Sequence, residues 1–261
     1  MKIKFILALL VLTGVTALPV KAQPSSMNGP ANPVTNTIAF PPGWSLMANP
    51  LFHYRGVTAA DAVPNNSVSE LFPQMPNGAV LLKFDNTAQQ FTRRNVFHHG
   101  RWSNPDETLA PSEGAFLFNP ERRALDIVFT GNWGYGAVSI PAGLSLISSP
   151  GPGTINFATS PPSPPVGGLP GPVLMGRIIT ATTNSATVPP FPPAWSGINF
   201  NPQEGDVVYT FDSAAGRFQR HTFRHGAWNS LPVIGIGQSC FVFTSHPRII
   251  QYAGTRPVQP E

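Results

Sequence analysis

Two short stretches of the chain concentrate side chains that could bind a charged ligand. Residues 93–102 (RRNVFHHGRW) and 217–228 (RFQRHTFRHGAW) both combine arginine, histidine and tryptophan. Arginine forms paired hydrogen bonds with phosphate and carboxylate groups, and aromatic rings stack on flat ligand rings. Protonation of the histidines in mildly acidic solution would add positive charge. The candidate ligand-binding residues are Arg93, Arg94, His99, Arg101, Trp102, Arg217, Arg220, Arg224, His225 and Trp228.

Two interpretations of these stretches compete. In the first, they hold an anionic polymer such as an acidic polysaccharide or an extracellular nucleic acid. In the second, arginine and histidine alternate on the solvent face of a strand, while Trp102 and Trp228 close the core. The recurrence of the residues fits both, because duplication alone would preserve them. The sequence leaves the choice open.

Metal binding and catalysis have less support. Residues four apart in a strand, such as His221 and His225, lie about 13 Å apart, too far to share an ion. His98 and His99 are neighbours and would point to opposite faces. The chain has no HExxH, CxxC or GxSxG motif. We therefore predict no catalytic residue, no metal site and no cofactor. A hydrolase whose Ser, His and Asp meet only in the folded chain is a third alternative.

The candidate residues belong to a series of three motifs that occurs twice along the chain, in the same order. An opening motif (41–51 and 141–151) precedes a hairpin motif (77–102 and 204–228) and a closing motif (113–118 and 238–243). AVLLKF and DVVYTF are rich in β-branched and aromatic residues, which indicates strands. Asp85 and Asp212 begin the turn, where a short polar side chain bonds the backbone ahead of it. Gly216 supplies positive φ near the end of the second turn.

The two hairpins differ in length by one residue. Six steps separate Phe91 from Phe97, but five separate Phe218 from Phe223. A one-residue slip would turn a side chain to the other face of the sheet. We therefore expect a bulge in the first copy, at Asn95 or Val96.

The quoted motifs resemble an uncharacterised all-β repeat module of secreted bacterial proteins. The resemblance rests on Gly43-Trp44-Ser45-Leu46 with Asn49-Pro50, on Leu82-Lys83-Phe84-Asp85, and on Ala110-Pro111-Ser112-Glu113-Gly114-Ala115-Phe116. The second copy departs from it at Leu144, Ser149 and Ser239. The resemblance implies a strand-rich fold and an exported protein, and it assigns no chemistry.

Composition agrees with an exported protein. Residues 1–22 combine Lys2 and Lys4 with an apolar run and small residues before position 23, as secretory signal peptides do. Three of the 16 basic residues lie in that segment, so 13 basic residues would remain against 12 acidic ones. A chain so near neutrality is no general polyanion binder, and such a role needs clustered charge. Cys240 is the one cysteine and lies in an apolar strand, so we expect a buried, inert thiol.

The sequence thus predicts an all-β protein of two related antiparallel sandwich- or barrel-like modules that arose from an internal repeat. We expect a flexible segment over 23–36, module 1 over 37–133, module 2 over 134–250 and a tail over 251–261. Module 2 carries a proline-rich insertion over 151–203. We expect a non-enzymatic structural, adhesive or matrix protein without a membrane span, in the extracellular space, at the cell surface or in the periplasm. Its expected partner is a surface or matrix polysaccharide or another polyanion.

Overall fold

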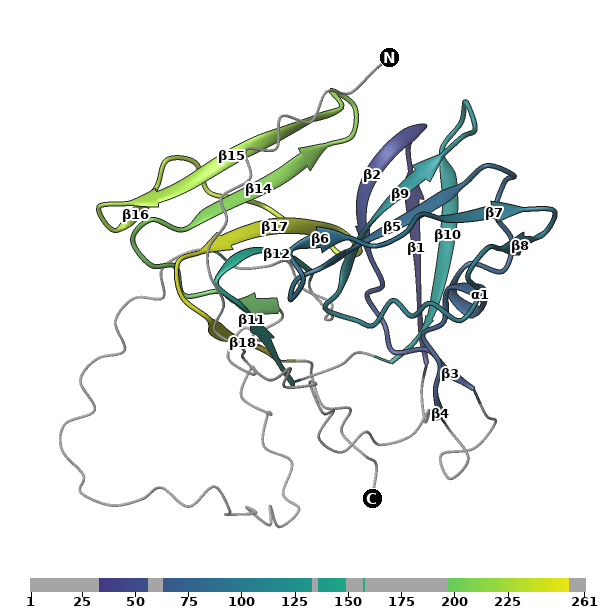
Figure 1. Ribbon diagram of the computed structural model, residues 1–261, viewed down its shortest axis with the longest axis horizontal. Coiled ribbons are helices and arrows are strands. Elements are labelled where there is room, and N and C mark those ends of the chain that lie inside the picture. Colours follow the sequence, from purple (N-terminus) through teal and green to yellow (C-terminus); the bar gives the residue numbers. More distant parts are fainter. Residues whose placement is uncertain (1–32, 56–62, 133–135, 149–156, 158–196, 254–261) are drawn as a thin grey trace, which may run out of the picture.

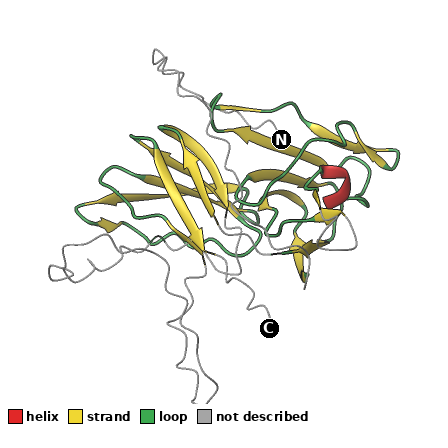
Figure 2. Ribbon diagram, turned by 90° about the horizontal axis from the view of Figure 1, so that it is seen from below, coloured by secondary structure: helices red, strands yellow, loops and turns green. Residues whose placement is uncertain are grey.

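The computed structural model describes residues 33–55, 63–132, 136–148, 157 and 197–253, and these residues form an all-β protein. One short helix, α1 (Val68–Leu71), interrupts the strands (Figure 2). Within the described ranges no helix has the length and apolarity needed to cross a membrane. The predicted signal peptide and most of the proline-rich insertion lie outside these residues. The all-β prediction is therefore confirmed for the part of the chain that is described.

The first half of the chain forms a main sheet, here called sheet 1, with the strand order β2-β9-β5-β7-β8. A short strand, β6, also pairs with β5, and β1 forms a separate antiparallel pair with β10. A small pair, β3-β4, lies outside these sheets. The strands are β1 (Val34–Phe40), β2 (Gly43–Ala48), β3 (Tyr54–Arg55), β4 (Val63–Pro64), β5 (Val80–Asp85), β6 (Gln90–Phe91), β7 (Asn95–His98), β8 (Arg101–Trp102), β9 (Gly114–Asn119) and β10 (Leu125–Gly131).

The second half repeats this arrangement in sheet 2, whose order is β12-β17-β14-β15-β16. Here β18 pairs with β11, as β10 pairs with β1, and β13 adds a third strand. The strands are β11 (Gly136–Ile140), β12 (Gly143–Ser148), β13 (Gly197–Asn199), β14 (Val207–Asp212), β15 (Arg217–Arg224), β16 (Ala227–Trp228), β17 (Ser239–Thr244) and β18 (Arg248–Ala253). In Figure 1 the two sheets lie side by side, with β8 and β16 on opposite sides of the molecule.

The strand registers of the two halves also correspond. Leu46 pairs with Phe116 in sheet 1, and Leu146 pairs with Phe241 in sheet 2. These are the partners that the aligned motifs 41–51, 113–118, 141–151 and 238–243 require. Descent of both halves from one duplicated unit stays a prediction, and the shared pairing order is the observation that agrees with it.

Each half has its own apolar core, between its main sheet and its outer strand pair. In the first half Met47, Leu81 and Leu117 of sheet 1 cluster with Ile127 and Phe129 of β10. In the second half Ile147, Val208 and Val242 cluster with Ile140 of β11 and Ile250 of β18. Because side chains alternate along a strand, the remaining side chains of each main sheet point to its opposite face, away from this core.

Those opposite faces, here called the inner faces, turn toward each other and join the halves. Leu46, Leu146 and Phe241 are the buried centre of this contact. Aromatic side chains surround them, and Phe116 of β9 lies 6.1 Å from Phe241 of β17 between ring centroids. The join is therefore an apolar contact between equivalent strands of the two sheets.

Hydrogen bonds complete the join, and they differ between its two sides. Asn86 accepts from Leu146 N (2.7 Å) and donates to Leu146 O (3.3 Å), and Gln89 does the same with Leu144 (2.8 and 2.6 Å). Two side-chain amides thus occupy the outer edge of β12, which lacks a strand neighbour there. Within the described residues, Ser213 and Gly216 at the equivalent positions make no such bond to β2.

The hairpin turns form as the sequence predicts. The amides of Thr87 and Ala88 donate to Asp85 Oδ1, and those of Ala214 and Ala215 donate to Asp212 Oδ1. Gly216 has φ +63°, and Gln89 adopts φ +54° at the same position of the first turn. The one-residue irregularity is present in the first copy, but its location was predicted wrongly. β6 ends at Phe91 and β7 begins at Asn95, so the extra residue lies within 92–94.

Candidate ligand-binding surface

The recurring His-Gly pairs are two-residue hairpin turns. His99-Gly100 joins β7 to β8 with φ +50° and +78°, and His225-Gly226 joins β15 to β16 with φ +54° and +77°. Positive φ at both central residues is the pattern of a type I′ turn, and histidine is among the residues enriched in that region. The backbone amides of His99 and His225 donate to Asn77 Oδ1 and Glu204 Oε2. Their recurrence therefore has a structural cause.

The two tryptophans pack into their cores and do not form an exposed platform. Trp102 is only 3% exposed and donates from Nε1 to Phe72 O at 2.9 Å. Trp228 is half-buried and donates from Nε1 to Phe157 O at 2.7 Å. This is the core-closing arrangement that the sequence offered as an alternative. The indole rings are consequently removed from the candidate ligand surface.

His221 is a buried structural residue. Its Nδ1 lies 2.8 Å from Ser230 Oγ, and its Nε2 lies 3.1 Å from Thr210 Oγ1. The equivalent residue of the first half, Asn95, is also buried and bonds Ser103 and Asn104 in the matching loop. The side chains of Asn95 and His221 thus hold the loop that follows each hairpin. His221 and His225 therefore do not converge on a ligand. Among the described residues, no group of three His, Cys, Asp or Glu is placed to hold a metal ion.

The six candidate arginines share a different environment, because all of them are exposed. None forms an ion pair or hydrogen bond through its guanidinium with any other residue that the structure describes. Arg93 and Arg94 lie in the interruption between β6 and β7, Arg101 begins β8, and the other three lie along β15. These residues are Arg93, Arg94, Arg101, Arg217, Arg220 and Arg224.

Strand alternation places part of this charge on the inner faces. On β15, Phe218, Arg220, Thr222 and Arg224 occupy alternate positions, so they share one face. Phe218 pairs with Phe211 and Arg220 pairs with Tyr209, both of which belong to the join. In sheet 1, Arg101 pairs with His98 at the tip of β7 and β8, which puts both on one face. Each inner face is therefore aromatic at the join and basic toward its far end.

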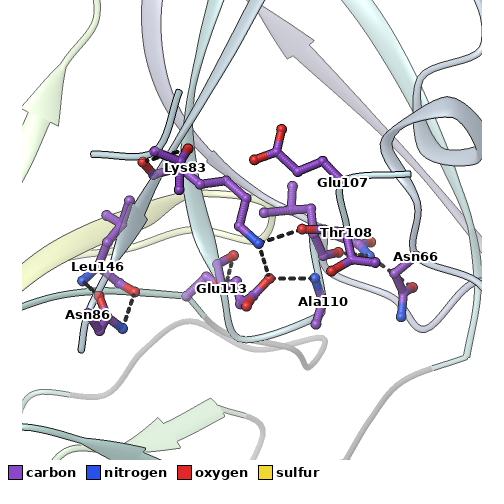
Figure 3. A network of polar contacts seen from close by, with 12 residues as sticks. Asn66, Lys83, Asn86, Glu107, Thr108, Ala110, Glu113 and Leu146 are labelled. Carbon is purple, nitrogen blue, oxygen red and sulfur yellow. Dashed lines mark hydrogen bonds and ion pairs between the residues drawn. The ribbon is translucent and has the colours of Figure 1, made fainter. Parts of the chain in front are cut away.

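Two other cations of the described chain, Arg248 and Lys83, are already engaged. Arg248 donates through both terminal nitrogens to Asp206, at 2.7 and 2.6 Å, and Asp206 is fully buried. Lys83 Nζ lies 2.8 Å from Glu113 Oε2 and also donates to Thr108 O (Figure 3). Glu113 Oε2 accepts from Ala110 N as well, so this network ties the loop before β9 to β5. Arg248 and Lys83 are therefore occupied within the fold, whereas the hairpin arginines, like Arg122 and Arg123 of the exposed loop between β9 and β10, remain open to a ligand.

Cys240 fits the expected buried thiol. It is fully buried in the second core, and burial raises the pKa of its thiol above the ordinary value. A thiol held neutral is a weak nucleophile, which agrees with a packing role.

The sequence did not indicate the exposed phenylalanines. Phe91, Phe218 and Phe243 are 41%, 40% and 43% exposed, and all three lie on the inner faces. A phenylalanine in a strand is expected to lie in the core, so only the packing of the two sheets shows that these rings reach solvent.

Comparison with protein-family models, with curated proteins and with solved structures finds no match. The resemblance to a secreted bacterial repeat module stays a prediction.

Proposed function

We propose that this protein is an exported, non-enzymatic adhesion or matrix protein that attaches to an anionic polymer. The observation that carries the proposal is the set of exposed hairpin arginines that have no acidic partner among the described residues. Arg248 is committed to Asp206 through both of its terminal nitrogens, whereas the hairpin guanidinium groups keep theirs for a ligand.

The placement of the arginines supports a polymer over a small ion. Arg220 and Arg224 share one strand face, and four strand steps separate them by about 13 Å. Two arginines at this spacing can each hold a separate anionic group, as successive groups along a polymer chain would require. Rigid antiparallel strands hold both side chains, so little backbone ordering is needed on binding.

The other candidate residues have structural roles that explain their positions without a ligand. His99 and His225 form turns, and Trp102 and Trp228 donate to core carbonyls. The proposed contact set is therefore smaller than the sequence suggested: Arg93, Arg94, Arg101, Arg217, Arg220 and Arg224. Because attachment then depends on charge, it should weaken as salt screens the arginines.

Retention on anionic resin tests the proposal. The chain without residues 1–22 is applied at low salt to heparin resin, to DNA resin and to the uncharged support. We expect retention on at least one anionic resin and elution when salt is raised. Passage through both anionic resins at low salt would contradict the proposal.

A further inference from the structure

The join between the sheets exposes an aromatic platform that the proposed function does not use. Phe91 of β6 and Phe218 of β15 occupy equivalent positions in the two halves. Each is about two-fifths exposed, and each packs against the same two rings, Phe116 and Phe241. The four ring-centroid distances lie between 5.9 and 6.2 Å. Two half-open rings thus flank a shared aromatic centre.

The platform is held firmly. Phe91 also packs edge-on against Phe84 at 5.2 Å, and Phe218 packs against Phe211 at 5.1 Å. Cross-strand pairs of this kind fix each ring on the face where it stands. A ligand ring that stacks here would meet surfaces that need no rearrangement.

The charged part of the surface begins next to this platform. Arg220 follows Phe218 on the same face of β15 after two residues, or about 6.6 Å, and Arg224 lies further along that face. The ligand that complements this order carries flat rings and regularly spaced anions on one chain.

We propose that this surface binds single-stranded nucleic acid, with bases stacked on Phe91 and Phe218 and phosphates held by Arg220 and Arg224. The inference rests on the proposed function and names the polymer. A phenyl ring offers a π face but no hydrogen bond, which suits an unpaired base better than a hydroxylated sugar ring. Single strands are favoured over a duplex, because base faces are covered in a duplex and open in a single strand.

Two oligonucleotides of equal charge separate stacking from charge. One is a fluorescent 20-residue oligothymidylate, and the other is a 20-residue abasic strand with the same number of phosphates. We expect the wild-type chain to bind the oligothymidylate at least tenfold more tightly, since one stacked base alone is worth about that factor. Equal affinity for the two strands would overturn the proposal.

Variants at the platform test which residues cause the preference. Phe91→Leu/Phe218→Leu keeps apolar contact but removes the rings, so the tenfold preference should vanish while heparin affinity changes by less than about twofold. Phe91→Tyr/Phe218→Tyr keeps the rings and should keep the preference. Val233→Leu, at an exposed apolar site in the loop between β16 and β17, serves as the matched control.

The outcomes distinguish this inference from the proposed function. If the wild-type chain binds neither heparin resin nor DNA resin, the proposed function fails. If resin binding holds but the leucine variant keeps its preference for bases, the stacking site is contradicted. If the leucine variant instead loses heparin affinity by tenfold, the aromatic platform serves a polysaccharide, and the nucleic-acid assignment is overturned.

Discussion

The two halves of this protein share a strand arrangement but differ at one site in their cores. Ala79 and Asp206 occupy equivalent places, and both carbonyls accept from the matching phenylalanine amide, Phe97 or Phe223. Leu125 of β10 and Arg248 of β18 also hold equivalent positions, and Arg248 forms an ion pair with Asp206. The same two positions thus hold two apolar residues in the first half and a buried ion pair in the second.

The two residues at these positions are therefore expected to be exchangeable as a pair but not singly. A buried charge without its partner is costly, while an apolar pair of similar size is often as stable as the ion pair. Three smaller differences also separate the halves: the amides that cover β12, the burial of the two tryptophans and the thiol of Cys240. Exchanging residues between equivalent positions tests each difference.

The largest effect is expected at the ion pair. Asp206→Ala leaves the Arg248 guanidinium largely buried and unpaired, so the free energy of unfolding should fall by about 3–5 kcal/mol. Asp206→Ala/Arg248→Leu copies Ala79 and Leu125 and should recover most of that loss. Urea denaturation measures both variants. A double variant no more stable than Asp206→Ala would refute the equivalence of the two sites.

The amide contacts at the join come next. Asn86→Ser/Gln89→Gly copies Ser213 and Gly216 and removes the side chains that satisfy Leu144 and Leu146. The lost hydrogen bonds should lower the free energy of unfolding by about 2–3 kcal/mol. Ser213→Ala, which removes no bond to β2, should change it by less than about 0.5 kcal/mol. Equal effects in the two variants would show that the amides contribute nothing to the join.

The two tryptophans should differ in the same assay. Trp102→Phe leaves the buried carbonyl of Phe72 without its donor, so we expect a loss of about 2 kcal/mol. Trp228→Phe removes a bond made by a partly buried ring and should lose about 1 kcal/mol. A larger loss at Trp228 would contradict the burial difference between the hairpins.

Cys240 should give a small effect that depends on pH. Its folded-state pKa is raised by burial, so the thiol stays neutral in the fold but ionises in the unfolded chain above its ordinary value of 9.0. The stability contribution is therefore complete below that value and is lost as pH rises. From pH 9 to 10 we expect a loss of about 1 kcal/mol. Cys240→Ala copies Ala115 of the first half and should abolish that part of the pH dependence.

Local signals in the sequence predicted the hairpins well. Asp85 and Asp212 bond the amides two and three residues ahead, and such short-range chemistry is visible in the residue order itself. The burial of Cys240 also followed from its apolar strand. By contrast, the prediction placed the extra residue of the first hairpin at Asn95 or Val96, whereas it lies within 92–94. Residue spacing shows that one residue is extra, but it does not show which residue lacks a partner on the neighbouring strand.

The candidate surface was predicted only in part. The arginines are exposed, as alternation along a solvent-facing strand suggests, but the tryptophans entered the cores. The open rings of Phe91 and Phe218 depend on how sheet 1 meets sheet 2. That contact joins residues more than a hundred positions apart, such as Phe116 and Phe218. No short-range pattern encodes it.

The most direct test of the proposed function compares two pairs of exposed arginines. Arg220→Ala/Arg224→Ala removes two charges from the inner face of β15, and Arg122→Ala/Arg123→Ala removes two from the exposed loop between β9 and β10. Binding to oligothymidylate and to heparin is measured from 50 to 200 mM salt. We expect the β15 variant to lose at least tenfold in affinity for one polymer. Its salt dependence should be shallower by about two charges, while the loop variant stays within about twofold of wild type. Equal losses in the two variants would show that overall charge, and not the hairpin surface, governs attachment.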